Sequence, residues 1–157
     1  MSKVGFWNAR ASVTLTIVVA WVALVLGVAA VPLMIPILNR FRFPGTVFDD
    51  SFVRLTTGPA YVCLLSGVAA VVIVLLLLRD IRRGEVFTSA NVARLRLISY
   101  CGFLISAACF VAAVLTPPRL VFIGVGLVAA FLGLLMRVIK NVIDAARLLK
   151  EDADYTI

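Results

Sequence analysis

Few side chains in this sequence can do chemistry, and their types exclude most enzyme mechanisms. The chain has no histidine, the residue that most often binds metals and acts as a general base near neutral pH. Its three cysteines, Cys63, Cys101 and Cys109, lie in apolar stretches without the CxxC spacing of a zinc or dithiol site. A P-loop and other cofactor-binding motifs are missing as well. We therefore expect a protein that is not an enzyme and that holds neither a metal nor a cofactor.

One pair of carboxylates lies beside aromatic residues. Asp49 and Asp50 share the segment 39–57 with four phenylalanines. An acidic pair of this kind is able to bind a cation or an amine, which makes these two residues a candidate ligand site outside the membrane. The alternative, which we favour, is a loop whose aromatic rings lie at the level of the lipid headgroups, the usual position of such rings.

The composition is too apolar for a water-soluble domain. Hydrophobic residues make up 63% of the 157 residues, charged residues 15%, and the mean hydropathy is +1.13, whereas soluble domains are about half apolar and about a quarter charged. A span across a bilayer needs about 20 apolar residues. Four windows without Asp, Glu, Lys or Arg meet or approach that length, namely 12–38, 58–78, 97–116 and 120–136. These windows predict an all-α integral membrane four-helix bundle that forms a single domain.

The first window admits a second interpretation as a cleaved signal peptide. Lys3 and Arg10 precede it, and residues 27–29 resemble a cleavage site. The apolar run continues to Leu38, which is longer than the core of a signal peptide, so a span is favoured. Pro32 and Pro36 predict a kink or an early end of this helix.

The distribution of cations predicts the orientation in the membrane. Eleven of the fifteen Lys and Arg residues fall in the segments 1–11, 79–96 and 137–157. Since short cytoplasmic segments are enriched in Lys and Arg, we expect both termini to be cytoplasmic, in a multi-pass membrane protein. The same bias accounts for the net charge of +7, so direct binding of nucleic acid is not expected.

The connection 79–96 carries clear helix-end signals. The second helix is expected to end at Gly84, which is free to adopt a left-handed conformation, after cations in its last turn. Thr88 is the predicted N-cap of the third helix. Phe87 and Val92 have the spacing of a hydrophobic staple, and Asn91 occupies the position that Glu or Gln takes in a capping box. A tight turn is therefore predicted between the two helices.

The segment 137–152 is an amphipathic helical tail. As a continuation of the fourth helix it exceeds the thickness of the hydrocarbon core and should project into the cytoplasm. Its apolar face, which needs a cover from the turn, a second subunit or another protein, consists of Val138, Ile139, Val142, Ile143, Ala146 and Leu149. Steps of small residues, such as Gly102 with Ser106 and Ala129 with Gly133, favour packing within the chain over a homo-oligomer, the other use of such steps.

Two segments carry a resemblance to a known family. They are GEVFTSANVARLR at 84–96 and LLKEDADYTI at 148–157. Together with four spans, they resemble a bacterial four-helix membrane protein family classed as domain of unknown function twenty-nine seventy-five. Asp154-Tyr155 stands where that family more often has an aliphatic residue before Thr-Ile. The resemblance implies a location in the bacterial cytoplasmic membrane. Members often occur beside a small helix-turn-helix regulator, so it also implies a cytoplasmic transcription regulator as a partner.

Two functions follow as hypotheses. The first is a regulatory or scaffold protein that binds a cytoplasmic protein through the 79–96 connection and the tail. Its candidate contact residues are Phe87, Asn91, Arg94, Val138, Val142, Ala146 and Leu149. For Phe87, Asn91 and Arg94 the alternative role is to cap the third helix and to hold the turn together. The second hypothesis is a small oligomeric channel or transporter that is not coupled to protons, because no span contains a carboxylate or a histidine.

Overall fold

The computed structural model describes residues 4–40, 50–84 and 88–155 and contains four helices. They are α1 (Val4–Arg40), α2 (Asp50–Arg82), α3 (Ser89–Leu115) and α4 (Arg119–Tyr155). All four are long and apolar enough to cross a membrane. The predicted all-α membrane architecture is confirmed, and the chain is a multi-pass membrane protein.

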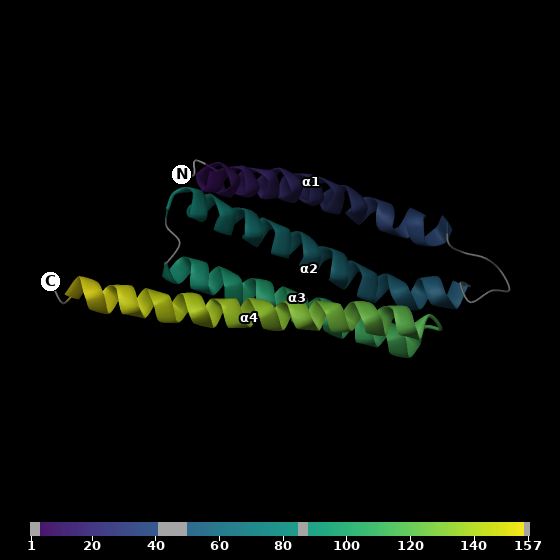
Figure 1. Cartoon of the computed structure of the whole chain (residues 1–157). Coiled ribbons are helices and arrows are strands. Elements are labelled where there is room, and N and C mark those ends of the chain that lie inside the picture. The colour runs from purple at the N-terminus through teal and green to yellow at the C-terminus, as the bar shows by residue number, and fades with distance from the viewer. Residues whose placement is uncertain (1–3, 41–49, 85–87, 156–157) are drawn as a thin grey trace.

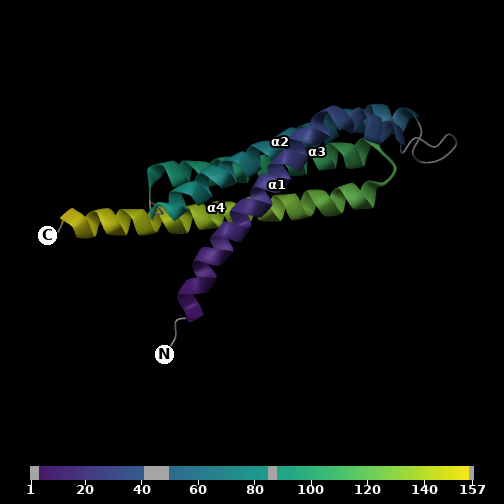
Figure 2. The same ribbon diagram turned by 90° about the horizontal axis from the view of Figure 1, so that it is seen from above.

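The helices pack in the order in which they follow one another along the chain. Close backbone contacts join α1 to α2, α2 to α3 and α3 to α4, and within the described residues no other pair of helices makes them. Figure 1 shows the four helices side by side, and Figure 2 shows α1 crossing the others obliquely while its N-terminal half diverges from them. The bundle is therefore an open layer, with α1 and α4 at its two edges.

Both termini lie at the same end of the molecule. The start of α1, the end of α2, the start of α3 and the last turns of α4 all lie toward this end (Figure 1), where the start of α1 diverges from the other three (Figure 2). We call this the termini end. Because α4 is longer than its neighbour α3, the last turns of α4 project beyond the start of α3 (Figures 1 and 2).

Helices α1 and α2 are longer than the predicted spans at the end opposite the termini. The segment 39–57 was expected to form a loop, but Asn39 and Arg40 belong to α1, and α2 begins at Asp50. Asp50 lies in the first turn of α2, where a negative charge interacts favourably with the helix dipole. The side chains of Phe52, in the same turn, and of Thr56, one turn later, are buried on one face of the helix. The expected loop is therefore wrong at both of its ends.

The prolines of α1 do not end the helix. Pro32 and Pro36 are inside α1, which continues to Arg40, so of the two predicted outcomes, a kink or an early end, the early end is excluded. Proline is tolerated in membrane helices when neighbouring groups support the disturbed backbone. Here the hydroxyl of Tyr61 in α2 donates a hydrogen bond to the Val31 carbonyl, at 3.2 Å, and holds this stretch of α1 against α2.

Helices α3 and α4 form a close hairpin. A Cβ added at Gly102 would lie 3.1 Å from the Gly133 Cα, so the two backbones touch without intervening side chains. Close to this point the Ser99 hydroxyl donates to the Gly133 carbonyl across the helices, at 2.8 Å. The small residues of these two helices are thus used within the chain, as predicted.

Candidate functional site

The turn between α2 and α3 is built from the helix-end signals of the sequence. Gly84 has a φ of +81°, a conformation that costs glycine little and other residues more. The backbone N–H groups of Arg83 and Gly84 donate to the carbonyls of Asp80 and Ile81, both at 3.0 Å. The prediction that the second helix ends here is confirmed.

Thr88 caps the first turn of α3, as predicted. Its backbone is extended, with φ −109° and ψ 150°, and its side-chain oxygen accepts a hydrogen bond from the Asn91 N–H. The two atoms are 3.3 Å apart. This bond satisfies one of the backbone donors that a helix start leaves without a partner, and it fixes the position of Asn91.

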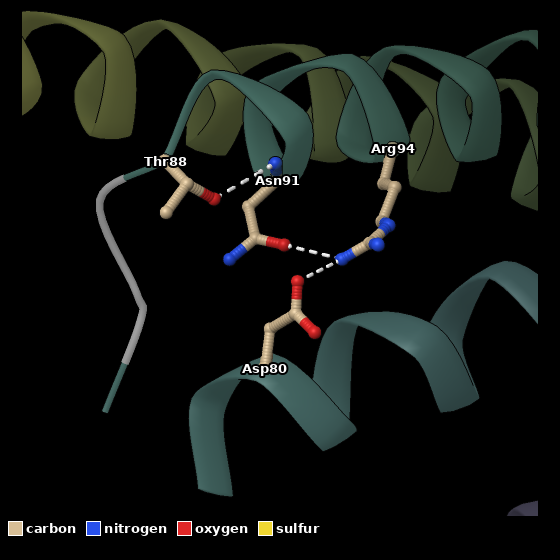
Figure 3. Close-up of polar contacts among 4 residues, drawn as sticks. All are labelled: Asp80, Thr88, Asn91 and Arg94. Atoms are coloured by element: carbon tan, nitrogen blue, oxygen red, sulfur yellow. Dashed lines mark hydrogen bonds and ion pairs between the residues drawn. The ribbon is translucent and has the colours of Figure 1, made fainter. Parts of the chain in front are cut away.

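Asn91, Arg94 and Asp80 form a polar cluster that joins α3 to α2 (Figure 3). One guanidinium nitrogen of Arg94 donates both to the Asn91 side-chain carbonyl, at 2.8 Å, and to a carboxylate oxygen of Asp80. Only 1% of the Asn91 surface is exposed, and the Asp80 and Arg94 side chains are largely buried. Next to the cluster, Val92 and Leu95 complete the buried face of α3. We refer to Asp80, Asn91 and Arg94 as the turn clamp.

The contacts within the turn clamp suit a structural role. The guanidinium of Arg94 can only donate hydrogen bonds. Here it donates to the side-chain oxygen of Asn91 and to the Asp80 carboxylate, so the three groups are engaged with one another. Asn91 and Arg94 are thus engaged inside the chain, the alternative role stated for them above. Sequence reasoning missed Asp80, although one signal pointed to it: a carboxylate in the last turns of a helix opposes the helix dipole and needs a cation nearby.

A family model described as "Protein of unknown function (DUF2975)" matches residues 34–157. The chain belongs to the DUF2975 family. No curated protein and no solved structure is similar enough to the chain to match it. The DUF2975 match includes the whole turn clamp and all of α2, α3 and α4, whereas α1 is matched only from Met34 onward.

The α4 tail of this DUF2975 protein leaves most of its predicted apolar face open. Val138, Val142 and Leu149 are 58%, 64% and 71% exposed. Ala146 is half buried, while Ala145 is exposed between Val142 and Leu149. Ile139 and Leu148 are exposed on other sides of the tail. The exposed residues Val138, Val142, Ala145 and Leu149 recur at i, i+4, i+7 and i+11, on one side of the helix. We call these four residues the α4 stripe.

The remaining predicted residues are not brought together. Phe87 and Asp49 lie outside the described residues, and Asp50 is the exposed first residue of α2. In the part of the chain that the structure describes, no three His, Cys, Asp or Glu side chains are grouped as metal ligands. The cysteines that do meet are Cys63 of α2 and Cys109 of α3, whose Sγ atoms are 3.9 Å apart.

Proposed function

We propose that this protein is a membrane-embedded docking protein that binds a cytoplasmic protein through the α4 stripe. The observation that carries the proposal is the exposure of three large or medium apolar side chains, Val138, Val142 and Leu149, on a helix that projects past the rest of the molecule (Figure 2). Spacing of i, i+4, i+7 and i+11 is the pattern of a helix that inserts into a hydrophobic groove of a partner.

Lipid alone accounts poorly for this exposure. The apolar run of α4 ends at Met136, and at 1.5 Å per residue Leu149 lies about 20 Å further along the axis. Packing against α3 sets the direction of α4, and the helix continues without a break to Tyr155. Val138 and Val142 lie about 3 and 9 Å beyond the same point, so it is the outer part of the stripe, toward Leu149, that favours a protein partner over acyl chains.

The proposed orientation places the termini end in the cytoplasm, supported by the excess of Lys and Arg in the segments gathered there. The turn clamp then has a positional role: it fixes the start of α3, along which α4 packs. A helix-turn-helix transcription regulator is our candidate partner, supported by the family resemblance of the 84–96 and 148–157 segments. The protein would thereby act as a membrane-bound regulator or scaffold.

The test compares two neighbouring substitutions on α4. Proteins that co-purify with the chain from its own membranes in mild detergent are identified by mass spectrometry, and the partner is then purified for binding assays. Val142→Asp places a charge on the stripe and should weaken binding at least about 30-fold, the effect of losing a central anchor. Asn141→Asp, which is exposed on another side of α4, should change affinity less than about twofold.

Because Val142 is exposed, its substitution tests binding separately from folding. A charge at a position that is 64% exposed should leave the fold intact, so both variants should unfold at the temperature of the unmodified protein. Equal binding by the two variants would refute the proposal, because the stripe would then make no contact with the partner.

A further inference from the structure

A polar hollow lies between α3 and α4 near the termini end. Its volume is about 250 Å³, and it is lined by Arg96, Ser99 and Tyr100 of α3 and by Arg137 and Lys140 of α4. All five side chains can donate hydrogen bonds. None of them belongs to the turn clamp or to the α4 stripe, so the hollow has no role in the function proposed above.

The hairpin geometry brings these residues together from two helices. Arg96 and Tyr100 are four residues apart on α3, and Arg137 and Lys140 are three apart on α4, so each pair shares one side of its helix. The hydrogen bond from Ser99 to the Gly133 carbonyl aligns the two antiparallel helices. Residues whose numbers sum to nearly the same value, such as Arg96 with Lys140, therefore stand at one level.

The hollow is lined by positively charged side chains and by no carboxylate. Three of its five lining residues are cations. The ion pairs found within the described residues lie elsewhere, between Arg94 and Asp80 and between Arg147 and Asp144. Like charges held close together repel one another, and an anion in the hollow would remove that cost.

The position along the membrane normal indicates which anion is available. The apolar run of α3 begins at Leu97 and that of α4 ends at Met136, so Arg96 and Arg137 mark the boundary of the hydrocarbon core on both helices. Lipid phosphates lie at this level, and basic pockets between membrane helices are known to bind anionic headgroups. Arginine and tyrosine supply the donors that a phosphate oxygen accepts.

We propose that this hollow binds a phosphate-bearing anion, and that an anionic phospholipid supplies it through its headgroup. Arg96, Arg137 and Lys140 contact the phosphate, and the Tyr100 hydroxyl donates a further hydrogen bond. A lipid held here joins α3 to α4 immediately below the projecting tail, so the lipid composition can affect the stability of the hairpin.

The experiment measures lipid retention by native mass spectrometry and affinity by titration. The purified chain in neutral detergent is titrated with phosphatidylglycerol and, separately, with phosphatidylcholine. We expect selective binding of phosphatidylglycerol. Arg137→Gln combined with Lys140→Gln should weaken that binding about 25-fold, about fivefold for each cation removed. The control, Arg119→Gln with Lys150→Gln, removes the same charge from α4 outside the hollow and should leave the affinity unchanged.

A second basic hollow provides the sharpest comparison. It lies between α1 and α2 and is lined by Arg79, Arg82 and Arg83 together with Trp21 and other apolar residues. Arg79→Gln with Arg82→Gln should leave the α3–α4 site occupied. If this variant loses the lipid while the Arg137 and Lys140 variant retains it, the proposal is overturned. Equal retention by all variants, or equal binding of phosphatidylcholine, overturns it as well.

A soluble source of phosphate is tested in the same assay. Inorganic phosphate is added to the chain in phosphatidylcholine nanodiscs, and bound phosphate is measured for the unmodified protein and for the Arg137 and Lys140 variant. We expect no saturable binding at millimolar concentration. Binding that depends on Arg137 and Lys140 would show that the anion comes from solution and would overturn the assignment to a lipid.

Discussion

At the scale of single residues, the turn clamp determines how α3 starts. Arg94 donates to both Asn91 and Asp80. The backbone N–H of Asn91 in turn donates to the side-chain oxygen of Thr88. A buried amide or ion pair is stable only while its partners remain. The three side chains therefore act as one unit, and the loss of one member affects the other two.

A double-mutant cycle tests this unit. Asp80→Ala and Arg94→Ala should each lower the free energy of unfolding by about 1 to 3 kcal/mol, since each leaves a largely buried charge without its partner. The double variant should lose less than the sum of the two. Unfolding is followed in mixed micelles, with the exposed Arg82 changed to Ala as a control that should stay within about 0.5 kcal/mol. Strictly additive losses would show that the two residues are independent.

At the scale of helices, the α3–α4 hairpin depends on backbone contact. A Cβ at Gly102 would meet the Gly133 Cα at 3.1 Å and the Ala129 carbonyl oxygen at 3.2 Å. Both of these are backbone atoms, which cannot move aside as a flexible side chain can. The helices must therefore separate to admit even a methyl group, and the hydrogen bond between Ser99 and Gly133 lies next to this contact.

Gly102→Ala should consequently destabilise the protein by about 1 to 3 kcal/mol, the usual cost of overpacking. Gly124→Ala is the matched control, because a Cβ there meets nothing within 4 Å and alanine favours a helix more than glycine does. Thermal unfolding in detergent measures both. A melting temperature of the Gly102 variant equal to or above that of the control would contradict the close hairpin.

The sequence predicted the end of α2 and the start of α3, where the signals are local. Gly84 and Thr88 act through their own backbone and the next few residues, so both positions were found. Helix α2 was placed too late, because its first turns contain Asp50, Arg54 and other polar residues that the apolarity criterion rejects. The pairing of Arg94 with Asp80 was not found, since the two residues are 14 positions apart and meet only once the turn has formed.

At the scale of the whole molecule, the order of the helices was beyond sequence reasoning. Lipid tails are as apolar as leucine, so the hydrophobic pattern does not show which side of a membrane helix meets a neighbour. Within the described residues, helix α1 is exposed over most of its span and contacts α2 alone. The hydrophobic pattern likewise did not show which side of α4 stays exposed. Of the three covers named for the apolar face of the tail, the turn within the chain leaves Val138, Val142 and Leu149 exposed.

The proposed orientation is tested by reporter fusions. With four crossings and a cytoplasmic termini end, a reporter that is active only outside the cytoplasm should be silent when joined after Ile157. A second reporter that is active only in the cytoplasm should give full signal at the same position. The reverse pattern would place the termini end outside and remove the cytoplasmic partner from the account.

The most direct test of the docking function is photo-crosslinking in intact cells. A photoreactive amino acid at Val142, which is 64% exposed on the α4 stripe, should form a covalent product with a soluble cytoplasmic protein. The same amino acid at Asn141, its neighbour on another side of the helix, should form little of that product. Reaction of position 142 with lipid alone, or equal yields of the protein product from both positions, would contradict the claim that the α4 stripe is a docking surface.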